Sequence, residues 1–170
     1  MLIASSTDGP TALLTVLEGL SPSVTAPSSP SICRRPSGEG KDGEILEPGH
    51  VYVAPGDKHM VLEQDGDAVR VRINDDPPEN FCRPSADPLF RSAEGIFGAK
   101  ILVTVLTGMG SDGEAGSRKI AEAGRTVITQ NEETSVVRGM PRAVAQAGLC
   151  SHVLPLPQIA GRLNKLAGGK

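Results

Sequence analysis

The sequence predicts an α/β protein with a doubly wound, mostly parallel sheet, helices on both faces of that sheet, and an inserted β-hairpin. Short apolar runs alternate with segments of helical periodicity through most of the 170 residues, which is the pattern of βαβ units. In addition, Asp65 and Gly66 stand between two runs of alternating apolar and polar residues, which indicates a hairpin. At this length we expect one domain over residues 1–170, with enough chain to bury a core.

Each expected element follows from its local pattern. Apolar runs bounded by Gly, Pro, Ser or Asp indicate strands, and apolar residues recurring every three or four positions indicate helices. In chain order we expect a strand at 1–4, a helix at 11–20, a strand at 50–55, a hairpin at 59–73, a helix at 86–98, a strand, loop and helix over 100–123, a strand at 125–130, a helix at 140–150, a strand at 152–156 and a helix at about 157–166.

Residues 21–44 interrupt this alternation. They are rich in Ser, Pro and Gly and show no hydrophobic period, so we expect a loop or linker there. A connection of this length without structure of its own is unusual inside a compact domain. We therefore treat 21–44 as an anomalous segment, either degraded or divergent.

Composition excludes several classes of function. The formal charge of −3 and the lack of a Lys/Arg run argue against nucleic-acid binding, and 2% aromatic residues leave little for stacking. Three widely spaced cysteines, Cys33, Cys82 and Cys150, fit neither a disulfide framework nor a zinc site. The chain shows no signal peptide and no apolar run of membrane-spanning length. We expect a cytoplasmic protein without membrane insertion and without a metal.

A glycine-rich loop follows the expected strand near residue 100. In "VLTGMGSDGEAG" the glycines Gly108, Gly110 and Gly113 have the G-x-G-x-x-G spacing of dinucleotide-binding loops, and Glu132 lies about 20 residues further on. However, Asp112 would place a carboxylate at the helix N-terminus, where a pyrophosphate would have to bind. A nucleotide-binding domain is therefore one alternative, which a thermal shift with NAD or ATP would reveal.

Asp112 itself allows two other interpretations. It could simply cap the helix that follows it. Alternatively, it could serve a hydrolase triad with Ser6, because Ser5, Ser6 and Thr7 end the first strand and the carboxyl ends of parallel strands share one edge.

Several blocks resemble one known family. "IASSTDGP", "LEPGHVYVAPGDKH", "DDPPENFCRPSADPLF", "VLTGMGSDGEAG" and "VVRGMPRAVAQAG" with "VLPL" are similar, in the same order, to blocks of the catalytic domain of chemotaxis protein-glutamate methylesterases (CheB-type). The resemblance covers about residues 2–20 and 40–165 and does not include the receiver domain that usually precedes this domain.

The resemblance implies a serine carboxylesterase that hydrolyses γ-glutamyl methyl esters on the cytoplasmic helices of methyl-accepting chemotaxis receptors, releasing methanol. Many members of the family also deamidate receptor glutamines. Ser6 would be the nucleophile and Asp112 the acid that orients the base. The backbone N–H of Met109, with help near Thr7, would stabilise the oxyanion. No cofactor is implied, and we expect a monomer.

The general base of the family is missing. The family carries its His in a Q-H-M-P motif, and aligning on Pro36 places Arg34 at that position, with about one helix missing before "DGEILEPG". An Arg guanidinium stays protonated and cannot act as a base. The three histidines offer no clear replacement: His50 and His59 fit core or hairpin positions, and His152 begins a late strand. Asp8 adds a negative charge beside the nucleophile.

Loss of the base predicts an almost inactive chain. In a well-studied serine protease this loss costs on the order of 10⁶ in turnover, or roughly 8 kcal/mol of barrier. Either a frameshift has damaged an ordinary gene over residues 21–40, or the chain is a pseudoenzyme that keeps the receptor-binding surface. Translation of codons 20–44 in the other reading frames discriminates between a frameshift and a pseudoenzyme. Only a frameshift would leave a Gln-His-Met-Pro motif encoded in another frame.

Overall fold

A parallel sheet forms the centre of the molecule. The computed structural model describes residues 1–21 and 36–168. Within them, four parallel strands lie in the order β1-β6-β7-β8. Each comes from one of the apolar runs, and their bounds are β1 Leu2–Ala4, β6 Leu102–Val105, β7 Thr126–Gln130 and β8 His152–Leu154. The register pairs Ala4 with Val105 and Val105 with Thr129, so the first three strands end at the same edge.

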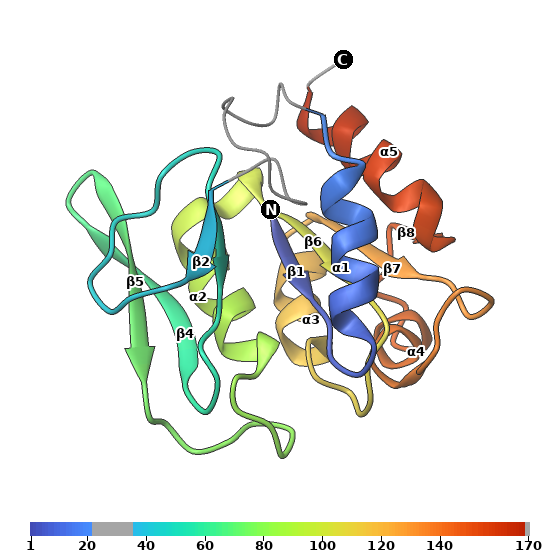
Figure 1. The fold of residues 1–170 in the computed structure, drawn as a ribbon, viewed down its shortest axis with the longest axis horizontal. Coiled ribbons are helices and arrows are strands. Elements are labelled where there is room, and N and C mark those ends of the chain that lie inside the picture. Colours follow the sequence, from blue (N-terminus) through green and yellow to red (C-terminus); the bar gives the residue numbers. More distant parts are fainter. Residues whose placement is uncertain (22–35, 169–170) are drawn as a thin grey trace.

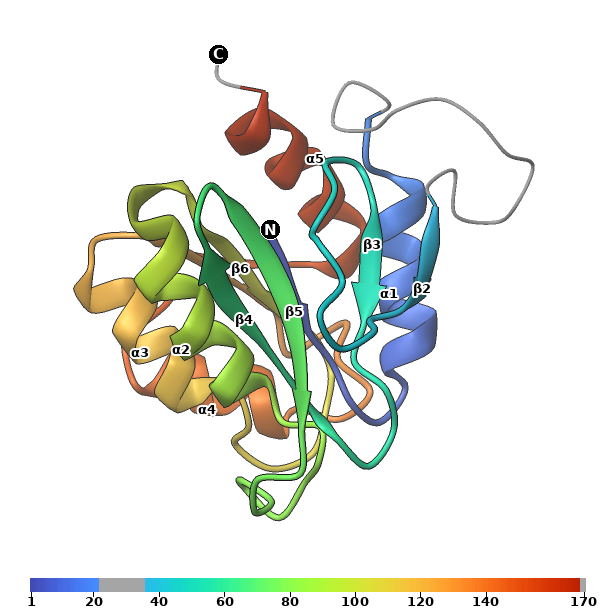
Figure 2. The same cartoon turned by 90° about the vertical axis from the view of Figure 1, so that its left-hand side faces the viewer.

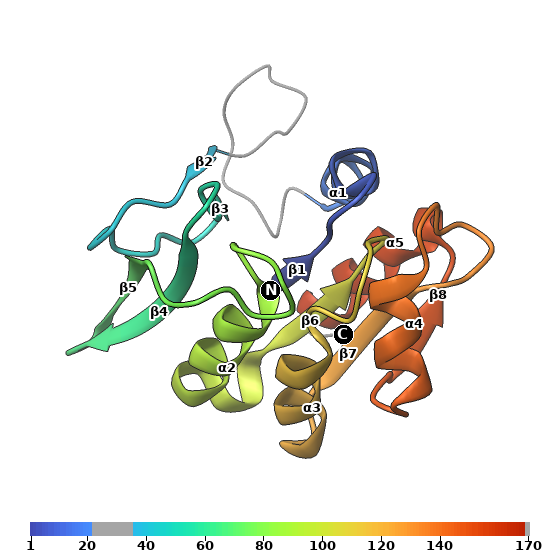
Figure 3. The ribbon, with the colours of Figure 1, turned by 90° about the horizontal axis from the view of Figure 1, so that it is seen from below.

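Helices cover both faces of this sheet, as Figures 1 and 3 show. The helices are α1 Gly9–Glu18, α2 Ala86–Phe97, α3 Glu114–Glu122, α4 Gly139–Gln146 and α5 Leu156–Ala167, with a short 3₁₀ turn at Gly98–Lys100. Successive strand residues point to opposite faces. Ile128 therefore joins a core with α1 and α5, whereas Val127 joins a core with α2, α3 and α4. The predicted fold class is confirmed.

The hairpin lies beside α2 (Figure 2). Its strands are β4 His59–Asp65 and β5 Ala68–Asn74, which pair antiparallel as predicted. The turn itself is Gly66-Asp67, one residue later than expected, because Asp65 still pairs with Ala68. Met60 and Leu62 pack into the same core as Phe90 of α2. The backbone N–H of Leu62 also donates to Ser92 Oγ at 3.0 Å. The hairpin therefore extends the core that covers one face of the sheet.

Two expectations need correction. Residues 21–44 were expected to hold no element, but β2 (Ser37–Glu39) pairs in parallel with β3 (Val51–Val53). β2 has only exposed residues, so pairing rather than apolar periodicity forms it. The helix expected at 140–150 ends at Gln146, because Gly148 adopts a left-handed φ of 71° that closes the helix. Residues 22–35, including Cys33 and Arg34, lie outside the described part.

Of the helices that the structure describes, none is both long and apolar enough to cross a membrane.

Candidate active site

The candidate site lies where β1, β6 and β7 end. The segment Ser5–Asp8 follows β1, the glycine loop Gly108–Gly113 follows β6, and the loop 131–138 follows β7. Figure 3, which views the molecule from below, shows these loops on the side of the sheet where the strands end. Ser6 and Asp112, which the sequence predicts to share one edge, are thus both at this edge.

Ser6 sits on a sharp turn between strand and helix. Its backbone N–H donates to the Thr107 carbonyl at 3.1 Å, and its own carbonyl accepts from the Gly9 N–H at 2.6 Å. Asp8 has a φ of 60°, so the chain turns from β1 into α1 within a few residues. The glycine loop comes close, because a Cβ on Gly108 would lie only 3.0 Å from the Ser6 Cβ. Ser6 nevertheless stays exposed, so its hydroxyl is accessible.

Two backbone N–H groups near Ser6 are free to receive a ligand. Among residues 1–21 and 36–168, no hydrogen bond uses the backbone N–H of Thr7 or of Met109. Both residues are exposed. Thr7 follows Ser6 directly, and Met109 follows Gly108, which lies close to Ser6. Unpaired N–H groups in such a position can stabilise an oxyanion.

The carboxylate of Asp112 is bound to the start of α2. It accepts hydrogen bonds from the Ser85 hydroxyl at 2.5 Å, the Ala86 N–H at 2.8 Å and the Asp87 N–H at 3.3 Å. The Asn80 amide donates to it at 3.3 Å. Asp112 is only 8% exposed. It therefore caps α2, whose first N–H groups would otherwise lack partners.

This arrangement corrects the interpretation of Asp112 as a cap for the helix that follows it. At the N-cap position of that helix, α3, stands Gly113, with no side-chain cap. In the described residues no hydrogen bond joins Ser6 to Asp112 either. The acid reaches the same edge as Ser6, but its oxygens are directed to another helix.

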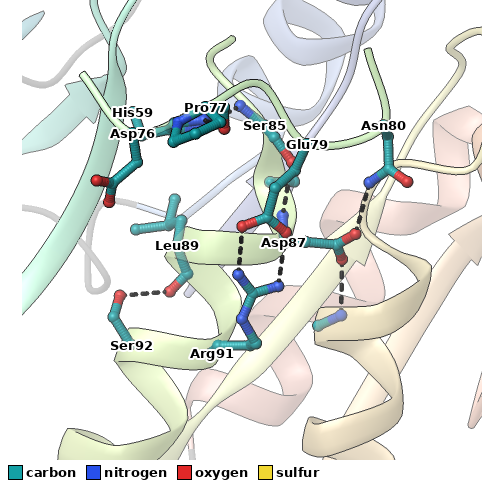
Figure 4. A network of polar contacts seen from close by, with 12 residues as sticks. His59, Asp76, Pro77, Glu79, Asn80, Ser85, Asp87, Leu89, Arg91 and Ser92 are labelled. Atoms are coloured by element: carbon teal, nitrogen blue, oxygen red, sulfur yellow. Dashed lines mark hydrogen bonds and ion pairs between the residues drawn. The ribbon is translucent and has the colours of Figure 1, made fainter. Parts of the chain in front are cut away.

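Asp87 completes a reciprocal arrangement (Figure 4). This residue of α2 accepts from the Gly116 N–H in the first turn of α3 at 2.6 Å and from the Asn80 amide at 2.8 Å. Asp112, which precedes α3, thus binds the first turn of α2, and Asp87 of α2 binds the first turn of α3. Burial raises the pKa of Asp87 above its ordinary value of 3.8, and the nearby charge of Asp112 adds to this rise.

A phosphate at the glycine loop is disfavoured by the same contact. The N-terminus of α3, where a pyrophosphate would bind, is already occupied by the Asp87 carboxylate. Glu132, the acid expected to hold a ribose, forms an ion pair with Arg138. The glycines instead allow the chain to turn: Gly110 and Gly113 adopt φ values of 80° and 86°.

The three histidines of the chain are all placed away from Ser6. His59 is buried, with Nδ1 accepting from the Ser85 N–H at 3.3 Å and Nε2 facing the Pro77 carbonyl at 3.2 Å. His50 pairs with Glu47, and His152 Nε2 contacts Arg162 at 2.6 Å. The expected core or hairpin position is confirmed for His59, which is buried at the start of β4, but is wrong for His50, which is exposed and lies outside the hairpin. None of the three contacts Ser6 or Asp112.

Sequence reasoning missed Asn80, Ser85 and Cys82, which surround Asp112. They stand in "ENFCRPSADP", part of a block that resembles the family but to whose residues the resemblance assigns no role. Burial, followed by the charge of Asp112, raises the pKa of the Cys82 thiol to about 11. Cys82 is therefore a neutral thiol rather than a nucleophile. In the described part of the chain, no cluster of three or more His, Cys, Asp or Glu could hold a metal ion.

The chain is similar to known proteins along almost its whole length. The family model described as CheB methylesterase matches residues 30–163. The protein-glutamate methylesterase/protein-glutamine glutaminase 1 of Rhodospirillum rubrum is 48% identical over 184 aligned positions, which cover 97% of this chain and 48% of the relative. The enzyme of the same description from Paramagnetospirillum magneticum is 46% identical, covering 97% of this chain and 48% of the relative. The chain thus spans about half the length of these relatives.

A solved structure matches the whole fold. The Thermotoga maritima CheB methylesterase catalytic domain superposes with a TM-score of 0.90 at 34% identity, covering 97% of this chain and 96% of that one. The match includes the parallel sheet and both helical layers that place Ser6 beside the glycine loop. The chain therefore belongs to the CheB methylesterase family.

Proposed function

We propose that this chain is the catalytic domain of a protein-glutamate methylesterase, acting in the cytoplasm as a monomer on methylated glutamates of chemoreceptor helices. One observation carries the proposal: Ser6 is exposed on a turn between the free N–H groups of Thr7 and Met109. The names of the relatives, which include methylesterase and glutaminase, give the substrate class. Release of ammonia from receptor glutamines is the parallel reaction.

The proposed reaction proceeds through an acyl-enzyme. Ser6 Oγ attacks the ester carbonyl carbon and loses its proton, while the carbonyl oxygen gains negative charge next to the Thr7 and Met109 N–H groups. The tetrahedral intermediate collapses, the ester C–O bond breaks, and methoxide takes up a proton to leave as methanol. Water then attacks the acyl-Ser6 ester, which regenerates the serine and a receptor glutamate.

Proton transfer is the weak step in this chain. His50, His59 and His152 are the only histidines in the sequence, and none of them contacts Ser6 in the structure. Arg34, at the family position of the base, cannot accept the proton. Water must therefore take the Ser6 proton, and we expect turnover reduced by roughly 10⁴- to 10⁶-fold relative to an intact triad.

A second candidate function, receptor binding without turnover, is favoured by the same histidine placement. The alignment with the Rhodospirillum relative is 184 positions long although this chain has only 170 residues, so the relative holds residues without a counterpart here. This difference would arise if this chain had lost a strand and a helix together with the histidine base. The chain would then keep the receptor-binding surface alone.

Methanol release from methylated receptor membranes separates the two functions. We expect slow release by the wild type, none above background by Ser6→Ala, and unchanged release by Ser5→Ala, which alters the neighbouring hydroxyl. Wild-type release equal to that of Ser6→Ala would defeat the esterase proposal. Binding to receptor fragments by both proteins would then support the second function, and absence of binding would exclude it.

A further inference from the structure

A hollow of about 420 Å³ with a mixed polar and apolar lining lies at the end of β7. It is formed by the end of β7, the loop that follows β7, helix α4 and strand β8. Its lining includes Gln130, Glu132, Arg138, Arg142, Gln146 and Val153. Its size lies within the range of about 300–1,000 Å³ found for small-ligand sites. The methylesterase reaction derived above uses none of these residues.

Hydrogen bonds connect this hollow to the loops around Ser6. Gln130, which is buried, accepts from the Thr107 N–H at 2.8 Å through its side-chain oxygen. The Thr107 hydroxyl contacts the Thr7 carbonyl at 3.4 Å and accepts from the Val137 N–H at 2.9 Å. Thr107 therefore links Gln130 in the lining of the hollow to the turn that carries Ser6.

The charge of the hollow suits a carboxylate. Arg138 and Arg142 face a single acid, Glu132, which pairs with Arg138. The Arg142 guanidinium is bound only by a neutral group: with the Gln146 amide oriented toward it, the carbonyl oxygen accepts from Nε at 3.0 Å and from Nη2 at 3.3 Å. No ion pair in the described residues includes Arg142. A planar guanidinium without an acidic partner is suited to bidentate binding of a carboxylate.

We propose that this hollow binds the carboxylate of an unmodified glutamate that flanks the reacting residue on the substrate helix, with Arg142 as its main ligand. The inference rests on the proposed function, since it assigns a second subsite to the same substrate. Arg142 is a specificity-determining residue and takes no part in the chemistry. Exposed Val153 at the wall of the hollow gives apolar contact for the neighbouring part of the substrate.

The test uses the full chain and two helical peptides, each with a central glutamate methyl ester. One carries Glu one turn before and after the ester, and the other carries Gln at those positions. We expect wild type to bind the Glu peptide more tightly, and Arg142→Ala to lose about tenfold in affinity for it, or about 1.4 kcal/mol, while binding the Gln peptide as before. Arg142→Lys should restore part of the preference, because it returns the charge without the fork.

Arg118→Ala is the matched control, because Arg118 is an exposed arginine on α3 that pairs with Glu114. It should bind both peptides as wild type does. Equal affinity of wild type for the two peptides, or an equal loss on both in Arg142→Ala, would overturn the subsite and leave the esterase proposal intact. Failure of wild type to bind either peptide would overturn the proposed substrate and the subsite with it.

Discussion

Replacing Asp112 tests the reciprocal capping of α2 and α3. In Asp112→Ala, the Ser85 hydroxyl and the Ala86 N–H lose their acceptor in a buried place, whereas the Asp87 N–H keeps the Ser85 oxygen at 3.4 Å. Each buried donor left without a partner costs about 1–3 kcal/mol. Relief of the charge repulsion with Asp87 offsets part of this cost. We therefore expect a loss of about 3 kcal/mol in the free energy of unfolding.

For a domain of this length the loss corresponds to a fall of about 6–12 °C in Tm. Thermal and urea unfolding followed by circular dichroism measure it, with Asp67→Ala, a change at an exposed position in the hairpin turn, as the control. Asp112→Asn should lose nearly as much, because its amide would face the Ala86 N–H or the Ser85 hydroxyl. A stability of Asp112→Ala within about 0.5 kcal/mol of wild type would refute the capping role and return Asp112 to a purely catalytic interpretation.

Three further predictions concern the surroundings of the site. Because burial raises the pKa of Asp87 above its ordinary value of 3.8 in the folded chain, wild type should gain stability relative to Asp87→Asn as the pH falls through the folded-state pKa toward 3.8, and a flat difference in urea unfolding contradicts this. Gly139→Ala should destabilise by about 1–3 kcal/mol, since its Cβ would lie 2.6 Å from the Gly110 backbone nitrogen, whereas Gly161→Ala, with open space, should not destabilise. With a pKa of about 11 against an ordinary 9.0, Cys82 should be alkylated roughly a hundredfold more slowly at pH 8 than in the unfolded chain, measured by peptide mapping.

The elements that the sequence predicted correctly are those with a strong hydrophobic period. The strands of the sheet run apolar and the strands of the hairpin alternate, so the burial pattern is enough to predict them. Strand β2 could not be found in this way, because Ser37–Glu39 has no apolar residue and forms only by pairing with β3. Tertiary pairing of this kind leaves no local signal.

In the site, too, some features have a local sequence signal and others depend on tertiary contacts. The placement of Ser6 and Asp112 at one edge of the sheet could be predicted, because the carboxyl ends of parallel strands share one edge. In the structure Ser6 follows β1 and Asp112 follows β6, as expected. The partners of Asp112 could not be predicted, because Ser85 and Ala86 stand 26 or 27 residues earlier in the chain and reach it only through the packing of α2 against α3. The roles of Ser6 as nucleophile and of Thr7 and Met109 as oxyanion donors stay predictions.

Chemical rescue by imidazole tests most directly the central claim, that a methylesterase site built around Ser6 lacks its base. Methanol release from methylated receptor membranes is measured at pH 8 with and without added imidazole, for wild type and Ser6→Ala. We expect slow release by wild type that rises with imidazole concentration and is absent in Ser6→Ala at every concentration. Turnover of about 1 s⁻¹ or faster without imidazole, the range of ordinary enzymes, would contradict it, as would equal release by the two proteins.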